Sequence, residues 1–469
     1  MNPKSTALLI LLALGLSAYV LLHEIDVPFQ EGAEQIFPGL QAQAITQLTI
    51  EHSGFAPLEL HRIPESENWM ITAPVRDQAD SVELHRLLEA ITHLPANTLN
   101  GIEESDSHGL ASPRTRIRFR TKDNEKTISL GSAGPLNQIT YVRVDPGKTL
   151  LAIPSEESEI LSPTLHSLRD RSLVRFPIHL VRTIRVKAGA LSPSGQDASY
   201  TLKRGDRKSA WLFSSPIADP ADPKSVRQLL NGLRNLQAQK FAEGAPPDLA
   251  LHGLTPPKWR IVLELEEGYR VGPIEIGRPS GPQNKTHVRI EGRDAILQID
   301  SKIFSQIEQP QELRSRDLIH RFPSPLARVI FSRPDGSHWT LLRVKSGWTI
   351  LDQKPDGTHL RESADKRSVQ KLIDRIRNAR IESIEADGVG SPPPVRYGLT
   401  PARVTVQLLA PDHTEGLTVI YIGSPTKSSP DKTYVQLSER PGSVFTIDTE
   451  LANHLVGTQR PEWLPLSSR

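Results

Sequence analysis

The stretch that comes closest to a known functional motif is Pro-Gly-Lys-Thr at residues 146–149, which matches the GK[ST] end of a phosphate-binding loop. In that loop, backbone N–H groups surround the phosphates and the lysine reaches them. The motif also requires a glycine five residues before Gly147, and Val142 occupies that position. We therefore predict a hairpin turn at 146–149, as at 292–294 (Gly-Arg-Asp) and 441–443 (Pro-Gly-Ser).

Dinucleotide, nucleophile and histidine-metal motifs are no better supported. Residues 388–390 (Gly-Val-Gly) lack the third glycine of a dinucleotide fingerprint and precede three prolines, so they are predicted to form a loop. Ser280 lies near Gly277 but in no Gly-x-Ser-x-Gly elbow. The 15 histidines include no His-Glu-x-x-His arrangement, and His287 is predicted to be a strand residue.

The densest acidic cluster is Glu103, Glu104 and Asp106, in a predicted connector. A calcium site needs more oxygen ligands at fixed offsets, so a solvated loop is favoured there. Cysteine is absent, which excludes disulfides and thiolate chemistry. The sequence thus predicts no catalytic, cofactor-binding or metal-binding residue and no cofactor, and we expect a protein that is not an enzyme. A site assembled from distant residues stays an alternative.

Composition indicates an ordinary folded chain of several domains. The 469 residues are 37% hydrophobic and 23% charged, which is enough apolar material for roughly three cores of about 150 residues. The net charge is only +2, with 56 basic and 54 acidic residues and no basic block. A nucleic-acid partner therefore has no electrostatic support.

The amino terminus predicts a location. Residues 7–22 are apolar except for two hydroxyl side chains, near the lower limit for crossing a hydrocarbon core of ~30 Å. Lys4 precedes this run and Glu24 follows it, which predicts an uncleaved single transmembrane helix with the body outside the cytoplasm. The alternatives are a buried helix and a cleaved signal peptide, for which only Gly15 and Ser17 offer a pair of small residues.

The rest of the chain repeats itself three times. The recurring landmarks, in order, are Phe-Pro at 37, 176 and 322; a strand tryptophan at 69, 211 and 348; Gly-Leu at 109, 253 and 398; and a strand that ends in glycine at 131, 277 and 423. The interval from Gly131 to Gly277 equals that from Gly277 to Gly423. Recurrence in the same order indicates tandem repeats. The tryptophans are predicted to be core residues rather than ligand-stacking ones.

Each repeat also contains one amphipathic helix. Apolar residues recur at i, i+3, i+4 and i+7 from Leu84, from Val226 and from Val369, the spacing of one helix face. Asp222, followed by proline, and Asp365 are predicted N-caps of the second and third helices.

These signals predict an α+β fold: an N-terminal transmembrane helix followed by three tandem antiparallel-sheet-plus-helix repeats. Each repeat would contain three strands, a helix, three or four strands and a closing helix. The predicted divisions are the anchor 1–23, a linker 24–36, and repeat modules 37–175, 176–321 and 322–469.

The anchor, the Phe-Pro landmarks and the ordered Trp, helix, Gly-Leu, glycine and Thr-Tyr-Val series (140–142, 433–435; Thr-His-Val at 286–288) resemble the bacterial domain-of-unknown-function family 4340, in three copies. The resemblance covers nearly all of the chain after the anchor. It implies an envelope protein associated with gliding-motility-type ABC transporters, and it supplies no catalytic residues.

Two functional hypotheses follow. The first is a non-enzymatic, membrane-anchored accessory or scaffold protein outside the cytoplasm, with ABC transporter subunits as its partner. The second is an envelope protein that binds a ligand or polymer in a pocket between modules. A continuous apolar surface would favour the first, and a large apolar pocket lined by two repeats would favour the second.

Overall fold

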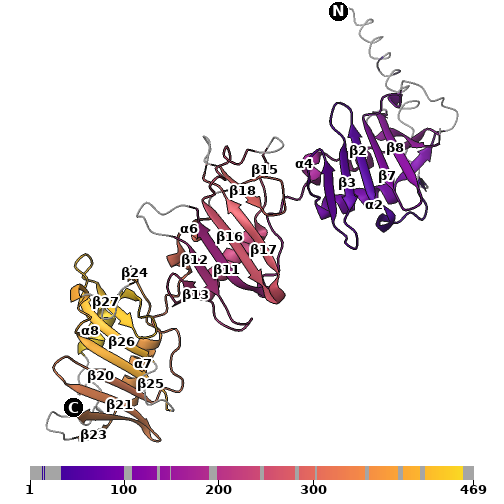
Figure 1. Ribbon diagram of the computed structural model, residues 1–469. Helices are drawn as coiled ribbons and strands as arrows, with labels where there is room; N and C mark the ends of the chain where they lie inside the picture. Colours follow the sequence, from indigo (N-terminus) through magenta and orange to yellow (C-terminus); the bar gives the residue numbers. More distant parts are fainter. Residues whose placement is uncertain are drawn as a thin grey trace, which may run out of the picture. The chain divides into compact units, whose positions relative to one another are not determined.

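The computed structural model describes residues 13, 15, 33–99, 108–134, 138–147, 149–189, 198–242, 248–279, 285–300, 304–353, 359–388, 395–411 and 418–457 (Figure 1). Their strands form three antiparallel sheets. The chain divides into two compact units. Unit 1 comprises 1–173, 237–249 and 287–299, and unit 2 comprises 174–236, 250–286 and 300–469.

The first sheet has the strand order β1-β6-β10-β9-β8-β7-β2-β3-β4-β5. Its strands are β1 (Glu34–Gln35), β2 (Gln47–His52), β3 (Leu58–Arg62), β4 (Trp69–Ala73), β5 (Asp77–Gln78), β6 (Pro95–Thr98), β7 (Thr115–Arg120), β8 (Glu125–Ala133), β9 (Ile139–Asp145) and β10 (Leu151–Pro154). The accompanying helices are η1 (Ala42–Ala44), α2 (Ser81–Thr92), α3 (Ser155–Ile160) and α4 (Leu165–Leu168).

The second sheet has the order β14-β13-β12-β11-β16-β17-β18-β19-β15. Its strands are β11 (Val181–Ala188), β12 (Tyr200–Lys203), β13 (Leu212–Ser215), β14 (Asp219–Pro220), β15 (Lys240–Phe241), β16 (Trp259–Leu265), β17 (Arg270–Ile276), β18 (Thr286–Ile290) and β19 (Leu297–Ile299). Its helices are η4 (Ile178–Leu180), α5 (Pro223–Asn235), η5 (Glu266–Gly268), α6 (Ser305–Glu308) and η7 (Pro310–Leu313).

The third sheet has the order β23-β22-β21-β20-β25-β26-β27-β28-β24. Its strands are β20 (Arg328–Ser332), β21 (His338–Val344), β22 (Gly347–Gln353), β23 (His359–Ser363), β24 (Ser383–Asp387), β25 (Val404–Leu409), β26 (Thr418–Pro425), β27 (Lys432–Leu437) and β28 (Ser443–Asp448). Its helices are α7 (Lys366–Arg377), η8 (Val395–Tyr397) and α8 (Thr449–Gly457).

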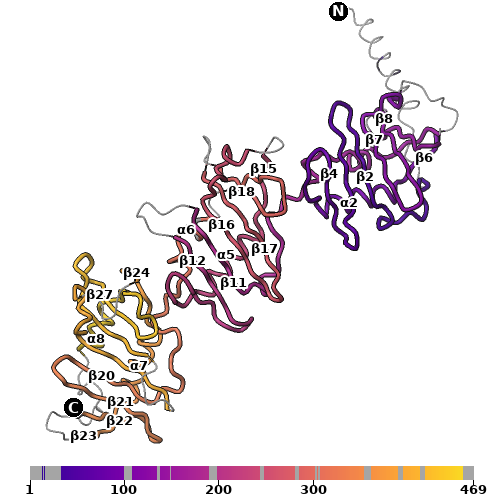
Figure 2. The backbone as a smooth tube through the Cα atoms, viewed as in Figure 1, coloured from indigo at the N-terminus to yellow at the C-terminus, as the bar shows by residue number. Residues whose placement is uncertain are grey.

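The three sheets share one topology, which the backbone trace makes easy to follow (Figure 2). Four strands, β2 to β5 in the first repeat, form one half as a meander, and β7 to β10 form the other half beside β2. The long helix of each repeat follows the first meander, and a short strand (β6, β15 or β24) then pairs with the last strand of the second half. The predicted three-repeat architecture is therefore confirmed.

The long helices form as their sequences predict. The side chain of Asp222 accepts a hydrogen bond from Ser225 N at 2.8 Å, and Asp365 does the same for Ser368 N, so both N-caps are confirmed. The predicted apolar face of each helix is buried. In the first and third repeats these faces pack with the strand residues of one hydrophobic core.

The glycine of the Gly-Leu pair and the glycine that ends the following strand recur because the two segments contact each other. Gly398 has φ +64° and Gly109 has φ +68°, a region that side chains disfavour. A Cβ on Gly423 would lie 2.2 Å from the Tyr397 carbonyl oxygen, and one on Gly131 would lie 2.2 Å from the His108 carbonyl oxygen. In the first and third repeats, the Gly-Leu turn thus lies against the strand where the strand has no side chain, and any larger residue would force the backbones apart.

The predicted fold class is wrong in two respects. The described chain is mostly antiparallel sheet, and each sheet carries only one helix longer than nine residues, because the expected closing helices are short (α3 has 6 residues and α8 has 9). An N-terminal transmembrane helix is also unsupported: no helix among the described residues is both long enough and apolar enough to cross a membrane. The predicted span, 7–22, lies outside the described residues except for Ala13 and Gly15.

The tryptophan prediction needs one correction. Trp69 and Trp211 are buried, at 3% and 6% exposure. In the third repeat, Trp348 is only partly buried against the core. The fully buried indole there is Trp339 on β21, at 5% exposure, which stacks on Phe331 with ring centroids 4.1 Å apart. The sequence places two tryptophans on adjacent strands, and packing with Phe331 decides which one enters the core.

Candidate functional site

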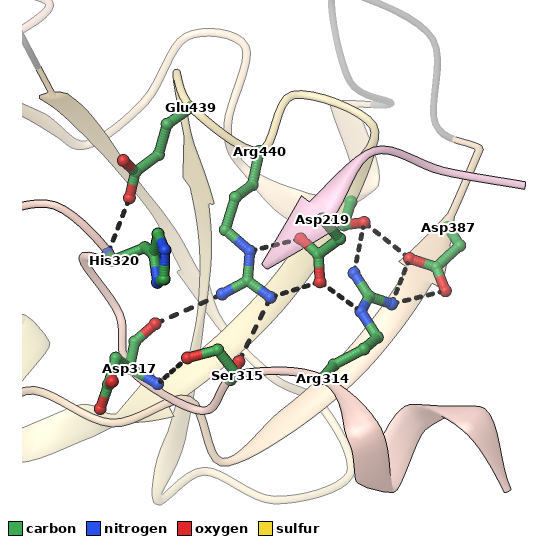
Figure 3. Close-up of polar contacts among 9 residues, drawn as sticks. Asp219, Arg314, Ser315, Asp317, His320, Asp387, Glu439 and Arg440 are labelled. Carbon is green, nitrogen blue, oxygen red and sulfur yellow. Dashed lines mark hydrogen bonds and ion pairs between the residues drawn. The ribbon is translucent and has the colours of Figure 1, made fainter. Parts of the chain in front are cut away.

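A buried ion cluster in unit 2 centres on Asp219, whose side chain is 2% exposed (Figure 3). Arg440 donates two hydrogen bonds to this carboxylate, from Nε to Oδ1 at 2.6 Å and from Nη2 to Oδ2 at 2.7 Å. Arg314 donates from Nε to Oδ2 at 2.5 Å. Asp219 lies on β14 and Arg314 follows η7, both in the second repeat, whereas Arg440 occupies the turn between β27 and β28 in the third. The cluster therefore ties two repeats together.

The remaining donors of the two guanidinium groups are largely satisfied as well. Arg314 Nη1 lies 2.9 Å from both carboxylate oxygens of Asp387, and its Nη2 donates to Ser443 Oγ at 2.9 Å. Ser443 in turn donates to Asp387 Oδ1 at 2.6 Å. Arg440 donates to the carbonyl oxygens of Ser315 and Asp317, each at 3.3 Å (Figure 3). Two cations and two anions thus form a neutral, hydrogen-bonded set, which is the condition for burying charge.

The electrostatics of Arg314 follow from this arrangement. Burial by itself lowers the pKa of the guanidinium. The hydrogen bond and charge of Asp219, together with Asp387, act in the opposite direction and hold the pKa above its ordinary value. The Phe445 ring covers the cluster, with the Arg440 guanidinium carbon 4.3 Å from the ring centroid. The Arg314 guanidinium therefore stays cationic and cannot serve as an acid or base near neutral pH.

Unit 1 contains a similar cluster, in which the carboxylate of Asp77 lies between two guanidinium groups and is fully buried. Arg169 Nε lies 2.7 Å from Oδ2, and Arg293 Nε lies 2.6 Å from Oδ1. Arg293 also donates from Nη1 to the Ser172 carbonyl oxygen at 2.9 Å and from Nη2 to the Asp170 carbonyl oxygen. Arg293 belongs to the turn between β18 and β19 of the second repeat. We call the Asp77 and Asp219 clusters the two joints.

The two joints use equivalent positions. Each aspartate stands three residues before the N-cap of its long helix, and each repeat-end arginine follows a short helix, α4 or η7. The backbone repeats too, because Asp80 N and Asp222 N donate to the carbonyl oxygens of Leu168 and Leu313, both at 2.8 Å. Equivalent placement in two repeats shows that the joint is a feature of the repeat unit.

Sequence reasoning missed both joints. It interpreted the stretches at 292–294 and 441–443 as plain hairpin turns, and both do lie in turns between strands. However, Arg293 and Arg440, which adjoins the second stretch, each contact a residue of another repeat. The usable signal was the recurrence of an aspartate three residues before a cap, at 77 and 219, together with a repeat-end arginine at 169 and 314. Nothing local distinguishes these arginines from solvated ones.

A second feature is a pocket of about 860 Å³ within the first repeat, in unit 1. It lies at the end of the first sheet, where β2 ends and β7 begins, beside the segment from α3 to α4. Its lining is His52, Ser53, Phe55, Ala56, Leu58, Pro74, Arg114, Thr115, Ser158, Glu159, Ser162, Thr164, Leu165 and His166. Its size is that of sites for small organic ligands.

A chain of hydrogen bonds fixes the pocket floor. His52 Nε2 lies 2.8 Å from the Pro163 carbonyl oxygen, which only accepts, so the ring carries its proton on Nε2. In the neutral ring, Nδ1 then accepts from the Thr115 hydroxyl at 3.2 Å. Thr115 Oγ1 also lies 3.1 Å from Ser162 Oγ. This chain pins the loop after α3 to the start of β7.

The other motifs singled out from the sequence do not assemble into a site. Gly147 lies in the turn after β9, His287 lies on β18 as predicted, and Gly388 follows β24. Lys148, Ser280, residues 389–390 and the acidic cluster at 103–106 lie outside the described residues. Within the described ranges, no group of three or more His, Cys, Asp or Glu side chains is placed to hold a metal ion.

Comparison with protein families accounts for the repeats. The family described as "Domain of unknown function (DUF4340)" matches residues 69–210, 211–384 and 359–464. The chain belongs to the DUF4340 family. The resemblance in three tandem copies is thereby confirmed. The first two DUF4340 matches begin at Trp69 and Trp211, on or next to a strand in the first half of a sheet, so their limits differ from those of the sheets. No match was found among curated proteins.

Proposed function

We propose that this DUF4340 protein is a non-enzymatic scaffold of the bacterial envelope, which holds a protein partner outside the cytoplasm. The observation that carries the proposal is the pair of joints. Each joint places a buried carboxylate between two guanidinium groups of different repeats. The two buried carboxylates, Asp77 and Asp219, are thus committed to linking repeats.

The joints suit a scaffold for an energetic reason. Removing one member of a buried ion pair costs about 3–5 kcal/mol, because its partner is left charged and without compensation. A joint therefore resists separation of its two repeats, and residues from both can contribute to one binding surface. Recognition spread over such a surface relies on many weak contacts rather than on a few reactive groups.

For the partner, we propose subunits of an ABC transporter, and for the location, the extracytoplasmic side of the inner membrane. Support for both comes from the resemblance that motivated them, since DUF4340 is the family to which the chain belongs. Protease treatment of spheroplasts tests the location, because an extracytoplasmic chain is digested without lysis.

Crosslinked co-purification of the full chain from native envelopes tests the partnership. We expect mass spectrometry to identify ABC transporter subunits, enriched over a tag-only control. The variant Asp219→Asn weakens a joint and should reduce capture, whereas Asp374→Asn alters an exposed ion pair and should leave capture unchanged. Absence of transporter subunits from the wild-type sample would reject the partner, and equal capture by both variants would reject the role of the joint.

A further inference from the structure

The lining of the first-repeat pocket combines an apolar wall of several side chains with one arginine. Leu58 and Leu165 line it beside Pro74 and Ala56, and the Phe55 ring, which is 77% exposed, stands at the same site. The lining also includes Arg114 and the exposed Glu159. A large exposed aromatic ring beside an apolar hollow costs free energy in water, and a bound apolar group removes that cost.

Hydrogen bonds hold Arg114 in place, and it forms no ion pair with another described residue. Its Nη2 donates to Ser158 Oγ at 2.7 Å and lies 3.5 Å from Thr140 Oγ1. Ser158 is itself fixed by the Thr140 hydroxyl at 2.9 Å and by the Ser155 carbonyl oxygen at 3.0 Å. Among the described residues, these two hydroxyl groups are the only side chains to which the guanidinium donates, so its other N–H groups are available to a ligand.

The second repeat shows what happens when this site is closed. Lys258 takes the place of Arg114, one residue before the strand, and it forms an ion pair with Glu308. Ser162 is the first-repeat residue that corresponds to Glu308, because their separation in sequence equals that of the equivalent glycines Gly131 and Gly277. The second repeat thus pairs its cation with a carboxylate, whereas the described part of the first repeat contains no ion pair of Arg114.

The space itself is also filled in the second repeat. Trp259 begins β16 as Thr115 begins β7, and it is 6% exposed. Phe304, 2% exposed, stands where the first repeat has Ser158, again at the interval that separates Gly131 from Gly277. Two bulky aromatic side chains in one repeat correspond to two small hydroxyl side chains in the other. The pocket is therefore built by these substitutions on a shared framework.

We propose that the first-repeat pocket binds a small amphipathic anion, an alkyl or aryl body that ends in a carboxylate. The apolar wall takes the body, and the free N–H groups of Arg114 take the carboxylate, which matches the planar guanidinium in shape and charge. The Thr115 and Ser162 hydroxyl groups, whose protons are used in the hydrogen-bond chain from His52, line the pocket beside this site. This binding site is independent of the joints and of any scaffold partner.

Isothermal titration calorimetry of the full chain tests the site, with decanoate as the probe and decyltrimethylammonium as its cationic match. We expect saturable binding of decanoate and none of the cation. Arg114→Gln should weaken decanoate binding by about 10- to 100-fold, the usual worth of a charged hydrogen bond. Lys258→Gln, the matched change in the second repeat, should leave binding unchanged.

Filling the pocket provides a test that does not depend on charge. Thr115→Trp introduces the second-repeat residue and should abolish decanoate binding, with circular dichroism used to confirm folding. Ser158→Phe serves the same purpose if that variant does not fold. Any of three results would overturn the proposal: no saturable decanoate binding, equal binding of both amphiphiles, or undiminished binding by Arg114→Gln or by a folded, pocket-filled variant.

Discussion

The Nε atom of Arg440 lies 2.6 Å from Oδ1 of Asp219, although 221 positions separate these residues in the chain. Both side chains are buried, at 1% and 2% exposure. The contact joins the last hairpin of the third repeat to a short strand of the second, and Arg293 with Asp77 repeats it between the second repeat and the first. Buried charge, rather than apolar surface alone, thus links successive repeats.

Neutralising Asp219 should destabilise the protein strongly. Asp219→Asn leaves Arg440 buried without its carboxylate, and we expect the free energy of unfolding to fall by about 3–5 kcal/mol. Urea denaturation measures the change. Asp374→Asn, at an ion pair whose two side chains are nearly half exposed, should cost under about 1 kcal/mol. Equal effects of the two substitutions would show that the joint contributes nothing special.

Truncating the long helices should be costly. Leu230 is 2% exposed and Ile373 is 4% exposed, so replacing either with Ala should lower the free energy of unfolding by about 2–5 kcal/mol through lost burial and a cavity. Leu251 is 75% exposed, and Leu251→Ala provides the control, with an expected change within about 0.5 kcal/mol. A loss below about 1 kcal/mol at both helix positions would contradict their core role.

The stability of unit 2 should depend on pH through Glu266. The hydrogen bond from Arg207, and the charges of Arg182 and Arg207, lower the pKa of this carboxyl from 4.5 to about 2. A carboxyl whose pKa is lower in the folded state stabilises the protein fully above its unfolded pKa, and this contribution disappears as the pH falls from about 4.5 toward 2.

Thermal unfolding as a function of pH measures this effect. Wild type should have a higher melting temperature than Glu266→Gln at pH 7, and the difference should shrink as the pH falls below about 4.5. Glu267→Gln changes the exposed neighbouring carboxyl and should not reproduce the effect. A difference between wild type and Glu266→Gln that is constant from pH 7 to pH 2.5 would contradict the assignment.

Loss of single polar side chains between the long helix and the second half of each sheet should not abolish function. If the chain is a scaffold, most single truncations cost under about 1 kcal/mol of partner affinity, whereas an enzyme can lose several orders of magnitude in rate from one. The measurement is an alanine scan of Asp, Glu, His, Ser and Lys in residues 101–113, 243–257 and 385–401, scored by rescue of the deletion strain. Asp387 is left out of the scan because it belongs to the Asp219 joint. One folded Asp, Glu or His variant without activity would revive the enzyme hypothesis, and deletion of a whole repeat serves as the positive control.

The sequence by itself determined the repeats and the interior of each one. Helix faces such as Val226 to Leu233 follow a 3.6-residue period, and caps such as Asp222 bond the next few residues. Both can therefore be predicted from a short stretch of sequence. Gly423 recurs because the Tyr397 carbonyl oxygen leaves no room for a Cβ, a constraint that marks the sequence at a fixed place.

The tertiary structure decided the joints and the pocket. Whether Arg440 is solvated or buried against Asp219 depends on a partner 221 positions away, and no periodic pattern records that pairing. The pocket likewise needs Arg114, Ser158 and Ser162, which come from two separate elements, to be set beside each other by the sheet. Hydrophobic period is a property of neighbouring residues, whereas charge compensation and empty space depend on which distant residues the folded chain brings together.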